Sequence, residues 1–289
     1  MLNVTQLLAA EVANRLGANF AVSFGGADSG HLALATQVSG DALRRIAASD
    51  ALYHNVEHTV YVTLVGLQIL LGKQILEGDV SRDDWLNVVV ALSCHDIGYV
   101  RGICLSDAKE RIATGVSNHT IRLGEGSSDA TLMPIHVDRG KRFVAENYAQ
   151  GEAMVDISLV QACIERTRFP VPNEATYLQN GDYPGLVRGA DLIGQLSDPR
   201  YLNKLSAVFY EFEEIGFNSN TGYRQPRDLL DAYPSFYERN VVPFIPESVR
   251  YLEQTKDGRE ILHSLYRNLD LARARDTQGS LPTALRQAR

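Results

Sequence analysis

The chain has 289 residues, enough to bury a sizeable hydrophobic core as one domain or as one domain with additions. Hydrophobic residues make up 45% and charged residues 22% of the sequence, an ordinary balance for a globular protein, and the net charge of −7 argues against a surface that coats nucleic acid. No apolar run approaches the ~18 residues that a membrane helix needs, so we expect no membrane association.

Two features of the sequence bear on the compartment. The first six residues lack the basic segment that opens a signal peptide. Cys94, Cys104 and Cys163 are an odd number without the spacing of a metal finger, which favours a reducing environment over a disulfide scaffold. We therefore expect a cytoplasmic protein.

Helix dominates the predicted secondary structure. Apolar residues recur at helical spacing over residues 1–17, whereas residues 20–40 are rich in Gly, Ser and β-branched residues and predict an irregular or short-strand segment. Asp41 is a candidate N-cap for a helix over residues 42–46. Further helices are predicted over residues 52–77, 82–98, 137–149, 153–166, 184–196 and 199–215.

Two local sequence signals mark a helix start and a loop within this predicted helical pattern. Ser81 and Asp84 form a capping signal at the start of the helix over residues 82–98. Three Gly and three Ser between residues 115 and 131 predict a long loop, and such loops in compact domains are often functional. Because strand-like alternation is scarce, we expect an all-α fold.

The chain divides into four predicted segments. Residues 1–45 form an N-terminal extension, and residues 46–216 form the main helical domain. Residues 217–270 form a helical or irregular segment packed on that domain, and residues 271–289, with several Arg plus Gly279 and Pro282, form a flexible tail. Aromatic residues of the later chain either pack this segment onto the core or stack a base, namely Tyr177, Tyr183, Tyr223, Tyr233, Phe236 and Tyr237.

Three histidines and two aspartates stand in or beside apolar helical segments. His54 and His58 are four residues apart, which on a helix places both rings on one face. His95 and Asp96 follow an apolar run 37 residues beyond His58, and Asp191 stands alone in a later apolar segment. Such groups are costly to bury unless a divalent metal or another partner pairs them. Surface histidines, or an Asp that caps a helix or forms a core salt bridge, are the alternatives.

The run Tyr53-His54-Asn55-x-x-His58, followed by His95-Asp96 and a distant Asp191, resembles the HD-domain superfamily of metal-dependent phosphohydrolases over residues 45–215. The first motif is similar to that of the cyclic-nucleotide phosphodiesterase branch. The resemblance implies an HD-type helical bundle for residues 46–216. It also implies one or two divalent ions (Mn, Mg, Zn, Ni, Co or Fe) held by His58, His95, Asp96 and Asp191.

The same resemblance assigns roles outside this ligand set. His54 matches the residue that protonates the leaving oxygen, a task suited to an imidazole near neutral pH. Asn55 would support the metal-bound water or Asp191 from the second shell, although it could also cap a helix. Asp96 would ligate one ion or bridge two, and is catalytic in that sense.

His136 bears on a second ion. Its His-x-x-x-Gly setting is similar to the segment that supplies a second-metal ligand in dinuclear members, while a solvated His at a helix start is the alternative. Tyr99 and the pair Arg166-Thr167 depart from positions that commonly hold further histidines. We therefore expect one tight ion and a weaker second ion held by Asp96 and His136.

These residues predict a phosphohydrolase, and more specifically a phosphodiesterase, for a small phosphorylated substrate such as a nucleotide. Arg188, three residues before Asp191, is the best candidate for a phosphate clamp, with an ordinary surface charge as the alternative. A di-iron oxygenase is the second hypothesis and requires both His119 and His136 as ligands. A non-catalytic metal- or nucleotide-binding sensor is the third.

Overall fold

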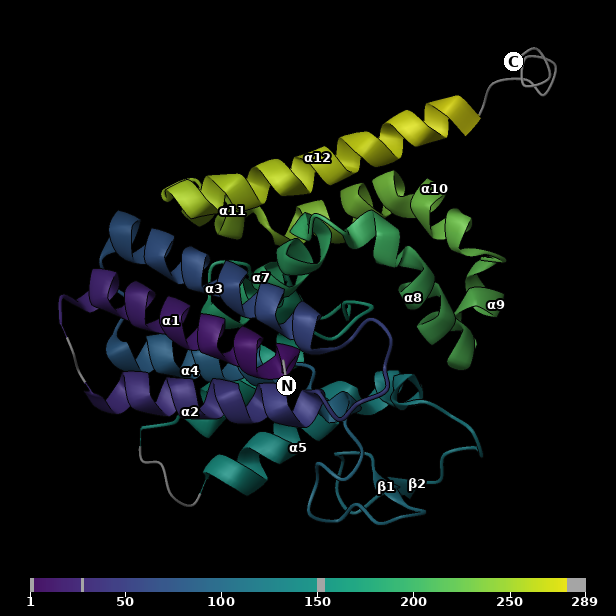
Figure 1. Cartoon of the computed structure of the whole chain (residues 1–289), viewed down its shortest axis with the longest axis horizontal. Helices are drawn as coiled ribbons and strands as arrows, with labels where there is room; N and C mark the ends of the chain where they lie inside the picture. The colour runs from purple at the N-terminus through teal and green to yellow at the C-terminus, as the bar shows by residue number, and fades with distance from the viewer. Residues whose placement is uncertain (1–2, 27–28, 150–153, 280–289) are drawn as a thin grey trace.

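The computed structural model describes residues 3–26, 29–149 and 154–279, and their fold is all-α, as predicted (Figure 1). The α-helices of the described chain are α1 (Val4–Phe24), α2 (Ser29–Ile46), α3 (Val56–Glu77), α4 (Arg82–Cys94), α5 (His136–Tyr148), α6 (Ile157–Arg166), α7 (Tyr183–Ser197), α8 (Tyr201–Glu214), α9 (Phe217–Thr221), α10 (Pro226–Phe236), α11 (Pro246–Leu252) and α12 (Lys256–Gly279). Shorter elements connect them: the 3-10 helices η1 (Ile97–Tyr99), η2 (Asp129–Ile135), η3 (Ala175–Leu178) and η5 (Val242–Phe244), the π-helix η4 (Tyr237–Val241), and the antiparallel strands β1 (Ile112–Ala113) and β2 (Thr120–Ile121).

Helix α3 is the centre of the fold. It packs against α1, α4, α7 and α11, and its side chains belong to the main hydrophobic core. By length and composition α3 could cross a membrane, but 61% of its most apolar window is buried inside the protein. The sequence expectation that no apolar run approaches membrane length is thus wrong for this helix. Other helices enclose α3, as they enclose the core helix of a soluble protein.

Residues 20–24 and 29–40 are helical, contrary to the prediction of an irregular or strand segment over residues 20–40, and residues 27–28 lie outside the described chain. Phe20 ends the buried stripe of α1, and Leu34, Val38 and Ala42 form that of α2 at helical spacing. The small residues allow close packing instead of breaking the helix: the buried Ser39 hydroxyl lies 2.8 Å from that of Ser93 in α4. Asp41 lies within α2 and is therefore not an N-cap.

The helices between residues 56 and 215 follow the prediction to within a few residues. Two of the helix ends that differ matter for the site. Ser81 and Asp84 form the predicted capping box. Helix α3 begins at Val56 and not at residue 52, and α4 ends at Cys94, so His54 and the pair His95-Asp96 lie just outside helices. Residues 115–131 are largely loop but contain β2 and the start of η2.

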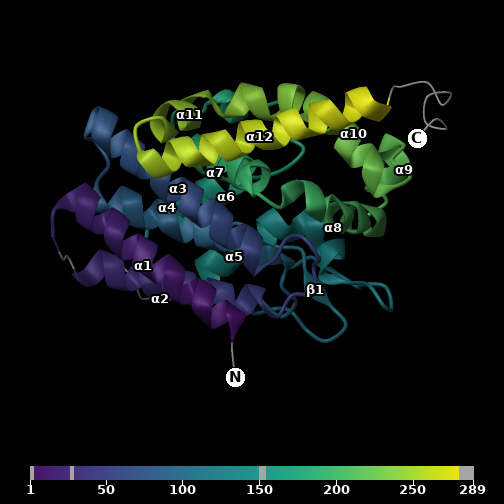
Figure 2. The same cartoon turned by 45° about the horizontal axis from the view of Figure 1, so that its top comes forward.

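The C-terminal helices cover one side of the core. Helix α12 lies along α10 and α11 in both views and also contacts α3 and α7 (Figures 1 and 2). The predicted boundary at residue 270 falls inside α12, which continues to Gly279, and residues 280–289 lie outside the described chain. Tyr233 and Tyr237 are buried, which agrees with a packing role for the aromatic residues of this segment.

Candidate metal centre

The predicted ligands of the first ion meet around two histidines. His58 lies in the first turn of α3, His95 and Asp96 directly follow α4, and Asp191 lies in α7. The Nε2 atom of His58 is 3.4 Å from His95 Nε2, 3.2 Å from Asp96 Oδ2 and 3.4 Å from Asp191 Oδ1. His95 Nε2 is 3.1 Å from Asp96 Oδ2 and 3.8 Å from Asp191 Oδ1. The ligand atoms of His58, His95 and Asp191 therefore form one group within 4.8 Å of one another, and Asp96 contacts both histidines of that group.

These spacings and orientations fit a divalent ion. Four ligand atoms at 2.0–2.2 Å from one ion in a tetrahedron are separated by about 3.3–3.6 Å. The distances from His58 and His95 to each other and to the two carboxylates, 3.1–3.8 Å, are close to this range. Asp96 Oδ2 is buried and forms no hydrogen bond with the described residues, although two imidazole nitrogens face it. His95 Nδ1 donates to the Leu92 carbonyl at 2.8 Å, which leaves the lone pair of Nε2 directed at the cluster. The donor set of two His and two Asp suits zinc, iron, manganese, nickel or cobalt.

The electrostatics of the cluster are those of a site that attracts a cation. Burial lowers the pKa of His58, but the adjacent carboxylates of Asp191 and Asp96 outweigh burial and raise it to about 10. Burial raises the pKa of Asp96, but the neighbouring imidazoles of His95 and His58 hold it well below its usual range. Two carboxylates therefore retain a proton on the buried imidazoles, and a metal ion would replace that proton.

Two glycines let the elements approach closely enough to form the site. A Cβ atom on Gly194 of α7 would lie 2.9 Å from the Cα of Val62 in α3, so only glycine allows this α3–α7 contact without a shift. A Cβ on Gly98 of η1 would lie 1.8 Å from the carbonyl oxygen of His136. The first contact brings Asp191 beside His58, and the second brings His136 beside Asp96.

His54 is held by a buried carboxylate. Its Nδ1 lies 2.6 Å from Oε2 of Glu211 in α8, and Oε1 of Glu211 accepts the backbone N–H groups of Tyr53 and His54 at 2.6 and 3.2 Å. Burial lowers the pKa of His54, but the charge and hydrogen bond of Glu211 outweigh it and raise that pKa. Since Nδ1–H donates to Glu211, Nε2 is the atom available for proton transfer. His54 precedes α3, so its predicted place on the same helical face as His58 is wrong, although their ring centroids are only 5.5 Å apart.

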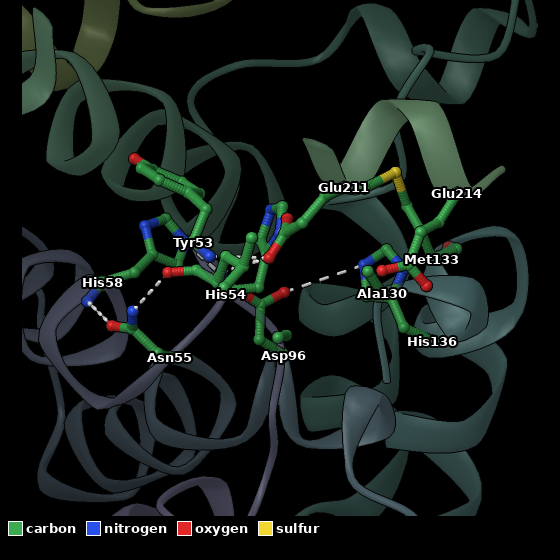
Figure 3. A network of polar contacts seen from close by, with 12 residues as sticks. Tyr53, His54, Asn55, His58, Asp96, Ala130, Met133, His136, Glu211 and Glu214 are labelled. Atoms are coloured by element: carbon green, nitrogen blue, oxygen red, sulfur yellow. Dashed lines mark hydrogen bonds and ion pairs between the residues drawn. The ribbon is translucent and has the colours of Figure 1, made fainter. Parts of the chain in front are cut away.

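Tyr99 separates His54 from His136. Its ring stacks on His54 with centroids 4.6 Å apart and on His136 with centroids 4.5 Å apart. His136 Nδ1 donates to the Met133 carbonyl at 2.5 Å, and its Nε2 lies 3.7 Å from Asp96 Oδ1 (Figure 3). Burial outweighs the charge of Asp96 and lowers the pKa of His136. A neutral His136 therefore presents a lone pair near the second oxygen of Asp96, as a second-site ligand requires.

Asn55 acts as a helix cap. Its side-chain oxygen accepts the N–H groups of Glu57 and His58 at 2.9 and 3.4 Å, and its amide nitrogen donates to the Leu52 carbonyl at 2.9 Å. These contacts satisfy the first N–H groups of α3, so the capping alternative is the one that the structure shows. Asn55 thereby starts the helix that carries His58, and its support of Asp191 or of a bound water stays a prediction.

Arg188 is a buried cation that lines the candidate site's cavity, and not a surface charge. It is 2% exposed, its guanidinium donates to the carbonyl of Tyr177 at 2.7 Å and to Asn180 Oδ1 at 2.7 Å, and it lies 4.2 Å from the ring centroid of Phe244. Burial lowers its pKa to about 10. These contacts anchor residues 177–180 beside the site, while the buried Nε has no hydrogen-bond partner among the described residues, so the phosphate-clamp role stays a prediction.

The cluster opens onto a cavity of about 110 Å³. Its walls include His54, Asp96, Tyr99, His136 and Asp191 together with aromatic residues from the later chain. The two candidate carboxylate ligands, the candidate second-site ligand His136 and the candidate acid His54 thus line one common space in which a small molecule could react.

The fold and this cluster define an all-α protein with a candidate metal centre between its core helices. The chain belongs to the Npun_R2479-like family, whose model matches residues 2–274. No curated protein matches the chain. The matched residues include α1, α2 and most of α12 as well as the site. The N-terminal and C-terminal additions to the predicted helical domain are therefore shared by the family.

Proposed function

We propose that this chain is a metal-dependent phosphohydrolase of the HD-domain type, and within that class a phosphodiesterase for a small phosphate ester. The observation that carries the proposal is that Nε2 of His58 and Nε2 of His95 lie 3.4 Å apart, and each lies 3.1–3.8 Å from a carboxylate oxygen of Asp96 and of Asp191. The motif order that resembles the superfamily supports the same reading.

The residues would divide the reaction among them. His58, His95, Asp96 and Asp191 would hold a divalent ion, which when bound lowers the pKa of a water molecule and neutralises phosphoryl charge. His54 would deliver the proton from Nε2 to the leaving oxygen as the P–O bond breaks, since Glu211 holds its other nitrogen at 2.6 Å. The raised pKa of His54 keeps this proton in place near neutral pH.

Asp96 and His136 would serve a second, weaker ion. Asp96 Oδ2 faces His58 and His95, while its Oδ1 lies 3.7 Å from His136 Nε2. Tyr99 occupies the space between His136 and His54 and supplies no nitrogen or carboxylate ligand. A second ion with so few protein charges would exchange readily.

The proposal is tested by loading the protein with metal and measuring its phosphoesterase activity. Chelator-treated protein is reloaded separately with Mn, Mg, Zn, Ni, Co or Fe and assayed on bis(4-nitrophenyl) phosphate, with the metal content measured by elemental analysis. We expect hydrolysis that depends on metal and is lost in Asp96→Asn. Lys256→Ala, on exposed α12, is the matched control and should keep full activity. Metal-loaded protein that hydrolyses neither this diester nor its monoester counterpart would overturn the proposal.

The same elemental analysis addresses the two other hypotheses. A di-iron oxygenase would need His119, but that residue is exposed in the turn between β1 and β2, where its backbone pairs with Thr114. Two tightly bound irons would revive that hypothesis. A non-catalytic sensor is disfavoured by the complete set of predicted ligands. The buried free cysteines support a cytoplasmic location.

A further inference from the structure

A second cavity of about 270 Å³ adjoins the one at the candidate metal centre. The two cavities share the walls formed by Phe169, Gln195, Val208, Phe212 and Phe236. The second cavity extends from these residues between α8, α9 and α10. A molecule with its reacting group at the cluster would therefore have room for another group on this side.

The chemistry of the second cavity differs from that of the first. Among the described residues that line it none is charged, and most are aromatic or aliphatic. Of its two side-chain amides, that of Gln195 already donates to the Tyr201 hydroxyl at 2.9 Å. Apolar walls favour an apolar occupant, because its transfer from water is favourable and leaves no polar group unpaired.

One residue of the cavity wall carries a polar atom that is left unmatched. Tyr233 lines the cavity and is 2% exposed, and its buried hydroxyl forms no hydrogen bond with any part of the chain that the structure describes. Buried hydroxyl groups in native proteins nearly always have a partner, so an isolated one indicates a missing partner. A ligand that carries one donor or acceptor on an otherwise apolar group would supply it.

We infer that this cavity, defined by Phe169, Phe236 and Tyr233, binds an aryl or alkyl group of the substrate while the phosphoryl group faces His58 and Asp96. This inference rests on the proposed function and narrows its substrate class to apolar phosphoesters. The cavity of about 270 Å³ is larger than the roughly 150 Å³ of an apolar cavity that binds benzene, so one ring with a short substituent fits. A nucleobase fits less well, because its several edge donors and acceptors would be buried among carbon atoms.

The first experiment tests the cavity without metal or catalysis. Binding of benzyl alcohol and of toluene to chelator-treated protein is measured by ligand-observed NMR. Ala232→Phe fills the cavity from α10, and Ser235→Phe adds the same side chain on the exposed face of that helix as the matched control. We expect both probes to bind, Ala232→Phe to weaken them about 10-fold or more, and Ser235→Phe to leave them unchanged. Tyr233→Phe should weaken benzyl alcohol and not toluene.

The second experiment tests substrate choice. Two phosphodiesters with the same 4-nitrophenyl leaving group are compared, one with a methyl and one with a phenyl group as the second ester. We expect kcat/KM to favour the phenyl ester about 10–100-fold, the range for burying one ring, and Ala232→Phe to bring this ratio close to one. Equal hydrolysis of both esters, together with no binding of benzyl alcohol or toluene, overturns the inference and leaves the phosphohydrolase intact. If Ala232→Phe blocks binding of the two probes but neither ester is hydrolysed, the binding role of the cavity is upheld and the proposed phosphohydrolase activity is overturned.

Discussion

Glu211 and His54 are 157 positions apart in the chain, yet the carboxylate of the first accepts a hydrogen bond from Nδ1 of the second at 2.6 Å. The side chain of Glu211 is 1% exposed, so this interaction is shielded from water and strong. It joins α8 to the segment that precedes α3 and leaves His54 Nε2 facing the cavity beside the cluster. The orientation of the proposed acid thus depends on a helix outside the motif that contains it.

The first prediction separates proton transfer from metal binding. His54→Ala should keep its metal but lower kcat about 10²–10⁴-fold, the range for loss of a general acid. Glu211→Gln should lower kcat by less. It should also move the loss of activity at high pH toward lower pH, because Glu211 raises the pKa of His54 and the acid is active only below that pKa.

The measurements for this prediction are the pH–rate profile and the metal content of each variant. Glu213→Gln, on the same helix, is the matched control and should keep the wild-type profile, because among the described residues the Glu213 carboxylate bonds only to Asn218. Loss of metal from His54→Ala would show that His54 is a ligand and that this division of roles is wrong.

The candidate ligands could be predicted from sequence because each stands beside a local signal. His58 falls in an apolar helix, and His95 and Asp96 follow an unbroken buried run in α4. Glu211 lacked such a motif. The only local signal is that Glu211 places a carboxylate in the apolar stripe of Val208 and Phe212. The sequence does not indicate which distant group this carboxylate binds.

Two departures from the sequence interpretation have tertiary causes. The segment 20–40 has the composition of a loop, but its small residues allow α2 to pack closely on α4, and that packing outweighs local propensity. The position of Arg188 indicated a cation near Asp191, and the structure adds an anchoring role, since its guanidinium donates to the backbone carbonyls of Tyr177 and Gln179. Such carbonyls cannot be recognised in the sequence, so the anchoring role could not be predicted.

The second prediction concerns loss of a ligand. Asp191→Asn should lower the metal content of the purified protein and abolish the rise in Tm that added metal gives the wild type, because a ligand that binds the folded state stabilises it by mass action. Asp198→Asn, at the C-terminal end of α7, should retain the metal-dependent rise in Tm, because the Asp198 carboxylate pairs with Lys204 and not with the cluster. An unchanged rise in Asp191→Asn would remove Asp191 from the ligand set.

The third prediction concerns the number of ions. Activity titrated with added Mn or Mg should show one tight phase and one phase near millimolar concentration. His136→Ala should remove only the weaker phase, since His136 approaches Asp96 from the side opposite His58 and His95. Gln161→Ala, at the surface cavity beside α5, serves as the control and should keep both phases. A tight stoichiometry of two that resists chelator would contradict this prediction and favour the di-iron hypothesis.

The last prediction concerns stability. Arg139 is fully buried, its guanidinium donates to both oxygens of the buried Asp107 at 3.1 and 3.0 Å, and it also donates to the carbonyls of Gly98 and Val100. Asp107→Ala leaves this cation without its counter-charge and should lower the free energy of unfolding by about 3–5 kcal/mol at pH 7. Burial raises the pKa of Asp107, but the hydrogen bonds of Arg139 and of nearby backbone N–H groups outweigh it and lower that pKa.

A carboxyl group whose pKa is lower in the folded than in the unfolded state stabilises the fold above its unfolded pKa of about 3.9, and this contribution disappears as pH falls through the folded pKa. The difference in unfolding free energy between wild type and Asp107→Ala should therefore be largest near neutral pH and shrink below about pH 4. Urea unfolding over this pH range measures it, and Glu260→Ala, in an exposed pair 3.8 Å from Lys256, should change little at any pH. A difference that is constant with pH would mean that packing, and not the charge of Asp107, holds the segment between η1 and α5.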